Sequence, residues 1–409
     1  MYIKRNLKQA FLEAGQFFPA LLLTGARQVG KTTFLRNNAE PGRRFVSLDP
    51  LDVRMLAKED PRLFLANNPP PVIIDEIQYV PELLPYIKQI IDEARNKDSG
   101  TARGMFWMTG SQQFELMKNV SESLAGRIGI FNLYGLSSRE MNGVSSAPFM
   151  PEHFSAEAMP PKTPGDFFAS LWKGSFPEIA VSENPLKYWQ KFYQSYLQTY
   201  LSRDVRDLTQ VADEHRFYAF LKAAAARTGQ MLNYSSLARD AEISQPTAKS
   251  YLSILETSGI VKLLYPYMKN RTKQMISAPK LYMLDTGLAA YLTSWNTPET
   301  LMDGAAAGHL FESWCFSEIL KSYANAGIEP DFHYYRDKDD NEIDLIIERD
   351  GTLYPVELKK AATVKRDDVK SFSKLAVFKQ PVGMGALVSL YPDCQLIKEN
   401  VRTIPAAAL

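Results

Sequence analysis

Short apolar runs alternate with helix-like stretches through the first third of the chain. The apolar runs cover residues 20–24, 44–48, 72–75, 105–109 and 129–133. Between them, apolar residues recur at helical spacing, and strands that alternate with helices pair in parallel. The pattern therefore predicts an α/β fold, built on a parallel sheet, for residues 1–145. Proline cannot join a sheet ladder, so we expect the third strand to begin directly after Pro69, Pro70 and Pro71.

The pattern changes after this region. Residues 145–165 are rich in Pro, Ser and Ala and have a weak period, which indicates a linker or the edge of a lid. Residues 185–209 follow a helical pattern with an aromatic stripe. The stripe consists of Tyr188, Phe192, Tyr196, Tyr200 and Leu201. Such a stripe favours a buried packing face over a base-stacking surface. We interpret residues 146–229 as a linker and helical connector.

Residues 230–300 have the order of elements of a winged-helix domain. Two helices are expected at 235–241 and 245–257, with Ser244 as the cap of the second, and strands at 260–265 and 280–284 would form a wing. The second helix would present Gln245, Thr247, Lys249 and Ser250 to a DNA groove. The wing carries only basic charges, from Lys262, Lys269, Arg271, Lys273 and Lys280, which suits phosphate contacts. Winged helices also brace neighbouring domains, so DNA contact and bracing both stay open.

Residues 301–409 contain two predicted strands, 341–348 and 353–359, joined by a turn. Asp344 lies on the first strand, Glu357 and Lys359 lie on one face of the second, and Glu312 lies on a helix at 308–322. This arrangement resembles the core of PD-(D/E)XK nucleases and implies an α/β restriction-endonuclease-like domain. Asp344, Glu357 and Glu312 would bind magnesium, and Lys359 would position a water or neutralise charge. The alternatives are a solvated charged strand edge, or a module that binds without cutting.

Further basic residues follow this pair of strands and could hold a phosphate backbone. They are Lys360, Lys365, Arg366, Lys370 and Lys374, and Asp367 and Asp368 dilute their charge. DNA is therefore a possible partner of both the winged-helix and the C-terminal domain.

A phosphate-binding loop lies between the first strand and the helix that follows it. It reads Gly25, Ala26, Arg27, Gln28, Val29, Gly30, Lys31 and Thr32, and Thr33 comes next. Its backbone N–H groups and the helix N-terminus would hold phosphate, Lys31 would reach the outer phosphates, and Thr32 would bind magnesium. Nucleotide binding is the firmest functional conclusion from the sequence.

Two carboxylates end the third strand, where side chains at the carboxyl edge of a parallel sheet face the loop. We expect Asp75 to hold magnesium and Glu76 to orient or activate the attacking water, although both could simply open the next helix. Thr109 and Ser111 are candidate sensors of the terminal phosphate, and Ser111 could equally cap a helix. Arg127 could stabilise the transferred phosphoryl group in its own or a neighbouring subunit, or form a surface salt bridge.

The composition limits the classes of protein to which the chain can belong. The chain has 409 residues, a net charge of +1 and 45% apolar residues, so global charge does not indicate nucleic acid. Two cysteines, Cys315 and Cys394, exclude a disulfide scaffold, and the four histidines have no metal-ligand spacing. The N-terminus lacks the apolar core of a signal peptide, and no run is long enough to span a membrane. We therefore expect a cytoplasmic protein without a membrane partner.

Seven stretches span most of the chain and resemble a known group. They are LLLTGARQVGKTTF, VIIDEIQ, WMTGSQQFELM, SLAGRIGIFNLYGLSSREM, GHLFESW, NEIDLII and PVELKK. Together they resemble a widespread prokaryotic group of AAA-type ATPases fused to an otherwise uncharacterised C-terminal region. The resemblance implies the ATPase fold and ATP as the nucleotide, and a homo-oligomer is possible because AAA-type ATPases commonly form rings. The sequence thus predicts an ATPase whose nucleotide state controls a DNA-associated module, with a magnesium-dependent nuclease and a non-cutting regulator as alternatives.

Overall fold

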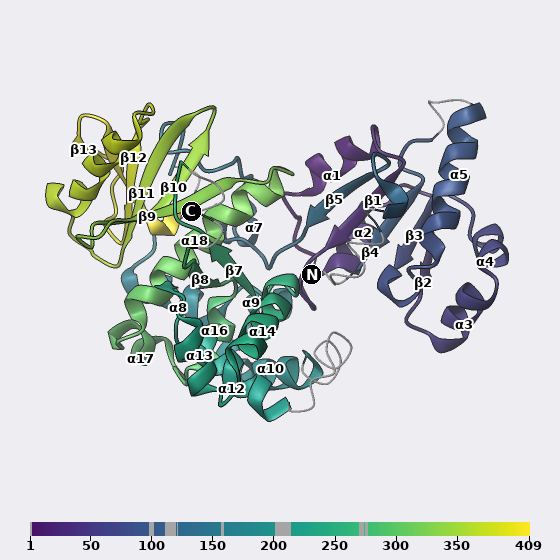
Figure 1. Ribbon diagram of the computed structural model, residues 1–409, viewed down its shortest axis with the longest axis horizontal. Coiled ribbons are helices and arrows are strands. Elements are labelled where there is room, and N and C mark those ends of the chain that lie inside the picture. The colour runs from purple at the N-terminus through teal and green to yellow at the C-terminus, as the bar shows by residue number, and fades with distance from the viewer. Residues whose placement is uncertain are drawn as a thin grey trace. The chain divides into compact units, whose positions relative to one another are not determined.

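The computed structural model describes residues 2–97, 102–110, 120, 122–156, 159–200, 214–269, 274 and 277–409 (Figure 1). Contacts divide the chain into two compact units. The first consists of Met1–Gly135, Thr257–Gly259 and Ala324–Gly327, and the second of Leu136–Glu256, Ile260–Tyr323 and Ile328–Leu409. The finer division at residues 145, 229 and 300 stays a prediction. No helix in the described ranges has both the length and the apolar character needed to cross a membrane.

The first unit is built on a five-stranded parallel sheet in the order β2-β3-β4-β1-β5. The strands are β1 (Ala20–Thr24), β2 (Arg44–Ser47), β3 (Val72–Asp75), β4 (Phe106–Thr109) and β5 (Ile128–Asn132). All five predicted strands form, with ends within one residue of the expected positions. Because β1, β4 and β3 are parallel neighbours, their carboxyl ends lie at one edge of the sheet, where the phosphate-binding loop follows β1, Asp75 ends β3 and Glu76 follows it.

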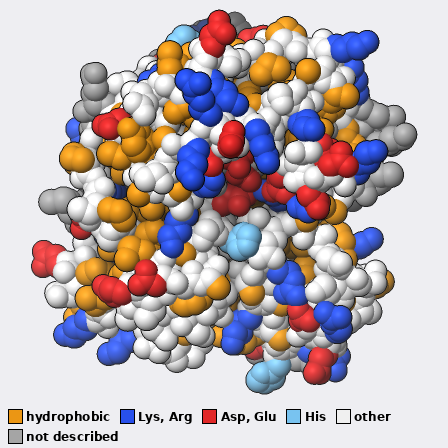
Figure 2. Space-filling view, turned by 90° about the vertical axis from the view of Figure 1, so that its left-hand side faces the viewer, with side chains coloured by type: hydrophobic (Ala, Val, Ile, Leu, Met, Phe, Trp, Pro, Cys, Tyr) orange, Lys and Arg blue, Asp and Glu red, His pale blue; other side chains and the backbone are white. Residues whose placement is uncertain are grey.

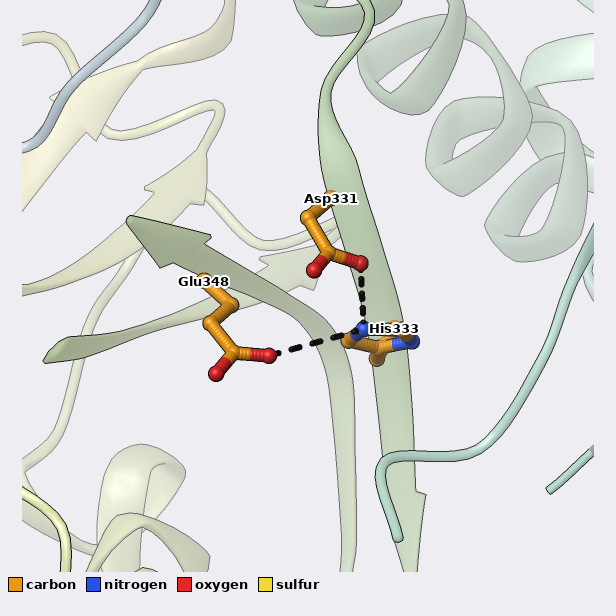
Figure 3. A group of neighbouring side chains, drawn as sticks. All are labelled: Asp331, His333 and Glu348. Carbon is orange, nitrogen blue, oxygen red and sulfur yellow. Dashed lines mark ion pairs between the residues drawn. The ribbon is translucent and has the colours of Figure 1, made fainter. Parts of the chain in front are cut away.

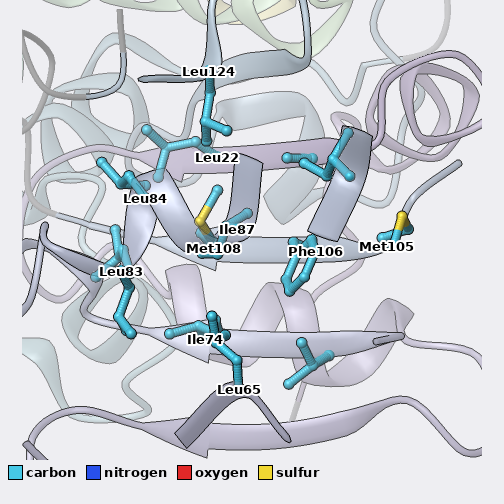
Figure 4. Close-up of a cluster of buried hydrophobic side chains, with 14 of the residues drawn as sticks. Leu22, Leu65, Ile74, Leu83, Leu84, Ile87, Met105, Phe106, Met108 and Leu124 are labelled. Atoms are coloured by element: carbon cyan, nitrogen blue, oxygen red, sulfur yellow. The ribbon is translucent and has the colours of Figure 1, made fainter. Parts of the chain in front are cut away.

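Helices cover this sheet and complete its core. They are α1 (Lys8–Gly15), α2 (Lys31–Asn38), α3 (Leu51–Glu59), α4 (Pro61–Asn67), η1 (Ile77–Tyr79) and α5 (Leu83–Lys97). Leu22, Ile74 and Met108, from the three central strands, lie in one buried cluster with Leu84 and Ile87 of α5 (Figure 4). Central strands covered on both faces bury every residue, which is why they appear in the sequence as continuous apolar runs.

The second unit begins with helices. They are α7 (Ser138–Met141), α8 (Pro164–Lys173), α9 (Pro177–Ala180), α10 (Pro185–Tyr200), α12 (Glu214–Ala225), α13 (Tyr234–Asp240), α14 (Gln245–Thr257), α16 (Thr286–Leu292), α17 (Pro298–Asp303) and α18 (Ala307–Asn325). A three-stranded sheet, in the order β6-β8-β7, lies among them, with β6 (Gln230–Met231), β7 (Val261–Leu264) and β8 (Lys280–Met283). The helices and strands expected between residues 230 and 300 therefore form, and the Ser244 hydroxyl caps α14 by accepting from Thr247 N at 3.2 Å.

The aromatic face of α10 differs from the predicted stripe by one residue at its start. Tyr196 and Tyr200 are buried as expected, but Tyr188 is 45% exposed and Phe192 is half-buried, and the neighbouring Trp189 and Tyr193 are buried instead. Steps of four residues drift by about 40° around a helix, whereas alternating steps of four and three stay on one face. Trp189 stacks on Trp172 at 4.4 Å between ring centroids, so this face packs internally. Leu201 lies outside the described residues.

The second unit ends in a mixed sheet, in the order β13-β14-β12-β11-β10-β9. Its strands are β9 (Asp331–Arg336), β10 (Glu342–Arg349), β11 (Thr352–Lys359), β12 (Gly385–Ser389), β13 (Leu396–Lys398) and β14 (Val401–Pro405), with η3 (Arg366–Phe378) and η4 (Ala406–Ala408). The predicted pair, β10 and β11, is an antiparallel hairpin, and positive φ angles at Asp350 and Gly351 allow its tight turn. β11, β12 and β14 pair in parallel.

Candidate functional site

The phosphate-binding loop connects β1 to α2, and two of its positions require glycine. Gly25 has φ 139°, and a Cβ there would lie 2.1 Å from the carbonyl oxygen of Leu133. Gly30 has φ 93° and forms the N-cap of α2. Both conformations are poorly accessible to other residues, so the motif's glycines are explained by the backbone path. Val29 is buried, whereas Gln28 and Thr33 are exposed.

Lys31 is held against the loop that it follows. Its Nζ donates to the carbonyl oxygens of Gly25 and Ala26, at 3.0 Å each, and the residue is buried. The ammonium therefore lies inside the curve of the loop. This is where a phosphate bound by the loop's backbone N–H groups would meet a positive charge.

The predicted magnesium ligands meet at the carboxyl edge of the sheet. Asp75 Oδ1 accepts from Thr32 Oγ1 at 2.8 Å and from Thr109 Oγ1 at 2.6 Å. Burial raises the pKa of the Asp75 carboxyl, against the lowering effect of these two hydrogen bonds. Magnesium prefers oxygen ligands, so the Thr32 hydroxyl and the Asp75 carboxylate together fit this ion.

Glu76 is separated from Asp75 by a sharp change of backbone direction. It has φ 60° and ψ 49°, in the left-handed region, and η1 starts directly after it. Its carboxylate accepts from the amide of Gln78. The predicted role of Glu76 in orienting water stays a prediction.

Thr109 holds the end of β3. The residue is fully buried, its hydroxyl donates to Asp75, and the same oxygen accepts from Glu76 N at 2.9 Å. Thr109 therefore positions the two acidic residues of the site. Its contact with a terminal phosphate stays a prediction. The other sensor candidate, Ser111, lies outside the described residues.

The position of Arg127 does not fit the expected stabilisation of the phosphoryl group in its own subunit. It immediately precedes β5, and its carbonyl oxygen accepts from Ala20 N at the start of β1. This is the amino edge of the sheet, about 15 Å along the strands from the loop. The guanidinium forms two hydrogen bonds with Asp92, at 2.7 and 3.1 Å, and holds the pKa of that carboxyl low. A role in a neighbouring subunit stays a prediction.

Arg5 braces the phosphate-binding loop, although no sequence motif pointed to it. Its guanidinium donates to the carbonyl oxygens of Val29 at 3.0 Å, Tyr134 at 2.6 Å and Gly135 at 3.3 Å. The side chain thus connects the loop to the segment after β5, a contact between residues more than a hundred positions apart. Only the folded chain reveals it.

Replacing Arg5 by methionine should lower the free energy of unfolding by about 2 kcal/mol, because buried carbonyl groups lose a charged donor. Urea unfolding of the two proteins measures this difference. Lys4→Met removes a neighbouring exposed cation and should leave the stability unchanged. Equal unfolding midpoints for Arg5→Met and Lys4→Met would show that the brace does not contribute to stability.

A second set of functional side chains lies in the second unit, where α18, β10 and β11 bring the predicted carboxylates together. Glu312 comes from α18 and Asp344 from β10, and Glu357 lies opposite Asp344 when the β10–β11 register is extended by one pair. The centre of this cluster is the ammonium of Lys280, which is 2.9 Å from Glu312 Oε1 and 3.1 Å from Asp344 Oδ1. Lys280 also contacts Glu342.

The position of Lys280 corrects the expectation that it contacts phosphate from the wing. Its side chain is only 2% exposed, because β8 is the middle strand of its sheet and directs this residue inward. Burial by itself would lower the pKa of the Lys280 ammonium, but Tyr282, Asp344, Glu312 and Glu342 raise it well above its usual value. Of the other wing residues, Lys269 is exposed and Lys262 half-buried, while Arg271 and Lys273 lie outside the described residues.

Two carboxylates of this cluster have raised pKa values. Burial, followed by the charge of Asp344, raises the pKa of Glu312 to about 7. The same two causes raise the pKa of Glu357 well above its usual range. Tyr282 donates to Glu312 Oε1 at 2.6 Å, and Asp344 Oδ2 accepts from Leu358 N at 2.9 Å. The cluster is therefore buried and hydrogen-bonded, and the Lys280 ammonium balances part of its negative charge.

Lys359 is not part of this cluster. Its ammonium pairs with Asp368 of η3, and its side chain is 46% exposed. The ion pair directs its ammonium toward Asp368 instead of the carboxylate cluster, and its role in positioning a water or neutralising charge stays a prediction. Lys360 is half-buried and donates to Met302 O, whereas Lys365, Arg366, Lys370 and Lys374 are exposed.

Figure 2 shows a face of the protein on which acidic side chains gather in a hollow, with lysine and arginine side chains around it.

A third group, which no sequence pattern indicated, lies at the opposite end of the β9–β10 pair. Glu348 pairs with Asp331 in the strand register, and His333 lies two residues further along the same strand (Figure 3). His333 Nε2 is 2.7 Å from Asp331 Oδ1 and 4.0 Å from Glu348 Oε2. Its Nδ1 contacts the Gln274 amide at 2.7 Å. Only the pairing of the strands could have revealed this group.

Three family models match parts of the chain, and one of them covers most of the first unit. Residues 18–142 match the family described as "AAA domain", and residues 165–299 and 307–409 match two families described as domains of unknown function, DUF8612 and DUF4143. The walker-type ATPase PABY2304 of Pyrococcus abyssi is 16% identical, with 71% of this chain and 96% of that chain covered, at a TM-score of 0.41.

Two relatives resemble most of the chain. The uncharacterized proteins Rv2008c of Mycobacterium tuberculosis and Mb2031c of Mycobacterium bovis are each 30% identical to it over 353 residues. The match covers 84% of this chain and 71% of each relative. The chain therefore belongs to the family of Rv2008c and Mb2031c, and its N-terminal part is an AAA-type phosphate-loop NTPase domain.

Proposed function

We propose that this protein binds ATP with Mg²⁺ at residues 25–33 and hydrolyses it with Asp75 and Glu76. The observation that carries the proposal is the convergence of Thr32 and Thr109 on Asp75 Oδ1, beside a loop whose curve encloses the Lys31 ammonium. If Asp75 only opened the next helix, two hydroxyl groups would not need to converge on one oxygen of its carboxylate. An ATPase needs oxygen ligands at this edge, next to the phosphates.

Each residue has a distinct task in this proposal. The backbone N–H groups of the loop and the Lys31 ammonium hold the outer phosphates, and Thr32 and Asp75 hold magnesium, which neutralises phosphate charge when bound. Thr109 keeps the end of β3 in position, so that Asp75 faces the magnesium ion and Glu76 faces the attacking water. Glu76, beyond the backbone turn, orients the attacking water.

Measuring phosphate release with and without magnesium tests this assignment. Wild type should release phosphate only when magnesium is present, and Thr32→Val should lower turnover by about a hundredfold, because its methyl groups cannot bind the ion. Thr363→Val makes the same chemical change at an exposed position of the second unit, so it is the matched control and should retain activity. Equal turnover in Thr32→Val and Thr363→Val would argue against magnesium at Thr32.

We further propose that nucleotide state controls a DNA-associated module formed by the second unit. α13, α14 and the β6-β8-β7 sheet have the elements of a winged helix, and Gln245, Lys249 and Ser250 are exposed on α14. α18, β10 and β11 carry carboxylates in the order of a restriction-endonuclease-like domain. Lys280 at the centre of these carboxylates and the pairing of Lys359 with Asp368 favour binding without cutting.

A DNA experiment separates a binding module from a nuclease. Wild type and Asp344→Ala are incubated with plasmid and single-stranded DNA, with magnesium or manganese, and with or without ATP. We expect ATP-dependent retention of DNA and no cleavage by either protein. Cleavage by wild type that is lost in Asp344→Ala would establish the nuclease alternative, and absence of DNA retention in every condition would contradict a DNA-associated module.

A further inference from the structure

The carboxylate cluster of the second unit already contains a cation, and that cation belongs to the chain. We propose that the Lys280 ammonium occupies the place where a restriction-endonuclease-like site would hold a divalent metal. The wild-type cluster then binds no Mg²⁺ or Mn²⁺, and removing the ammonium opens a metal site. This proposal depends on the cluster alone and on none of the residues assigned to ATP.

The geometry suits an ammonium group. A protonated lysine has three N–H donors, and Lys280 Nζ contacts three carboxylates, those of Glu312, Glu342 and Asp344. The separations of 2.9 Å to Glu312 and 3.1 Å to Asp344 are hydrogen-bond lengths, whereas Mg²⁺ takes oxygen ligands at about 2.0–2.1 Å. The donor count of lysine matches the number of acceptors around it.

The backbone holds Lys280 in this position. β8 pairs with β7 on one side and β6 on the other, and Lys280 is opposite both Leu264 and Met231. Tyr282, two residues further along the strand, donates to the same Glu312 oxygen that Lys280 contacts. Strand pairing fixes the backbone of Lys280, and its side chain is only 2% exposed. Moving the ammonium aside for a metal ion would therefore require the surrounding side chains to repack.

Charge also separates the two possible occupants of the cluster. A divalent ion bound by Glu312 and Asp344 would lie within a few ångströms of the Lys280 ammonium, which contacts the same two carboxylates. The two positive charges would repel each other, so Lys280 and a metal ion exclude each other.

Calorimetric titration of Mn²⁺ into the full chain, without nucleotide, tests the proposal. Lys280→Met keeps most of the apolar stem and removes the ammonium, so this variant should bind one Mn²⁺ more than wild type does. Lys269→Met, at an exposed wing position, is the matched control and should behave as wild type. Adding Asp344→Asn to Lys280→Met should weaken the new site at least about tenfold, because a charged ligand is lost.

Thermal unfolding provides a readout if Lys280→Met folds poorly. Unbalanced carboxylates should lower its melting temperature in EDTA, and Mn²⁺ should restore it, whereas the wild-type melting temperature should not respond through this cluster. Lys280→Met/Glu342→Gln, which loses one carboxylate together with the cation, should fold better and still bind the ion. Mn²⁺ binding by wild type that Asp344→Asn abolishes would overturn the proposal, as would a folded Lys280→Met variant that binds no additional ion.

Discussion

Replacing Lys31 by alanine should reduce ATP hydrolysis by about a thousandfold or to background, because the loop loses the charge that meets the outer phosphates. The structure holds the Lys31 ammonium at 3.0 Å from two carbonyl oxygens of the same loop, where a phosphate bound by the loop would meet it. Steady-state phosphate release with saturating ATP and Mg²⁺ measures the effect.

Lys58→Ala is the matched control for this substitution. Lys58 lies on α3 of the same unit and is exposed, and its removal changes the net charge by the same amount. It should hydrolyse ATP at the wild-type rate. If Lys31→Ala retained wild-type turnover, the loop could not be the site of hydrolysis.

Replacing Glu76 by glutamine should separate ATP binding from ATP hydrolysis. Glutamine keeps the size of the side chain and removes the negative charge, so water orientation is impaired while the loop and the magnesium ligands are retained. We expect turnover to fall by about a hundredfold or more, with ATP affinity within a few-fold of wild type. Single-turnover hydrolysis and calorimetric ATP titration measure the two properties.

The neighbouring Asp75→Asn provides the contrast. Asp75 accepts from Thr32 and Thr109, so loss of its charge should weaken magnesium-dependent ATP binding as well as turnover. Equal hydrolysis by Glu76→Gln and wild type would exclude Glu76 as the residue that orients water. The main-chain turn at Glu76 is the structural reason why two adjacent carboxylates are expected to act differently.

The ATPase fold was largely predictable from the sequence because its signals are local. A strand buried on both faces must be continuously apolar, so β1, β3 and β4 could be located within one residue. The glycines of the loop are likewise determined by their own backbone angles. The meeting of Thr32 with Asp75 followed from the rule that parallel strands place their carboxyl ends at one edge.

Side-chain direction over long distances was not predictable in the same way. Lys280 is one of several basic residues in a stretch without acids, and charge pattern alone did not reveal that the middle strand turns it inward toward Glu312 and Asp344. The position of such a residue depends on which strands pair, and that information is not contained in a local pattern.

Arg127 is a different case. It directly precedes the strand predicted at residues 129–133, so the edge rule that places Asp75 at the carboxyl edge of the sheet places Arg127 at the amino edge.

The buried stripe of α10 illustrates a smaller error of the same kind. The apolar character of the helix was evident, but choosing between Tyr188 and Trp189 as the first buried residue required the spacing of the whole face. At His333, no sequence pattern indicated a group that the structure contains. Asp331 is two residues away on the same strand, but Glu348 is brought next to it only by the pairing of β9 with β10, so the spacing of the histidines did not indicate these neighbours.

Titration of ATP and Mg²⁺ into the wild-type protein in a calorimeter tests the central claim most directly. A saturable heat for one nucleotide per chain, lost in Lys31→Ala and retained in Lys58→Ala, is the result that the structure predicts. No heat of binding in a folded wild-type protein, or equal binding by wild type and Lys31→Ala, would contradict nucleotide binding at the loop.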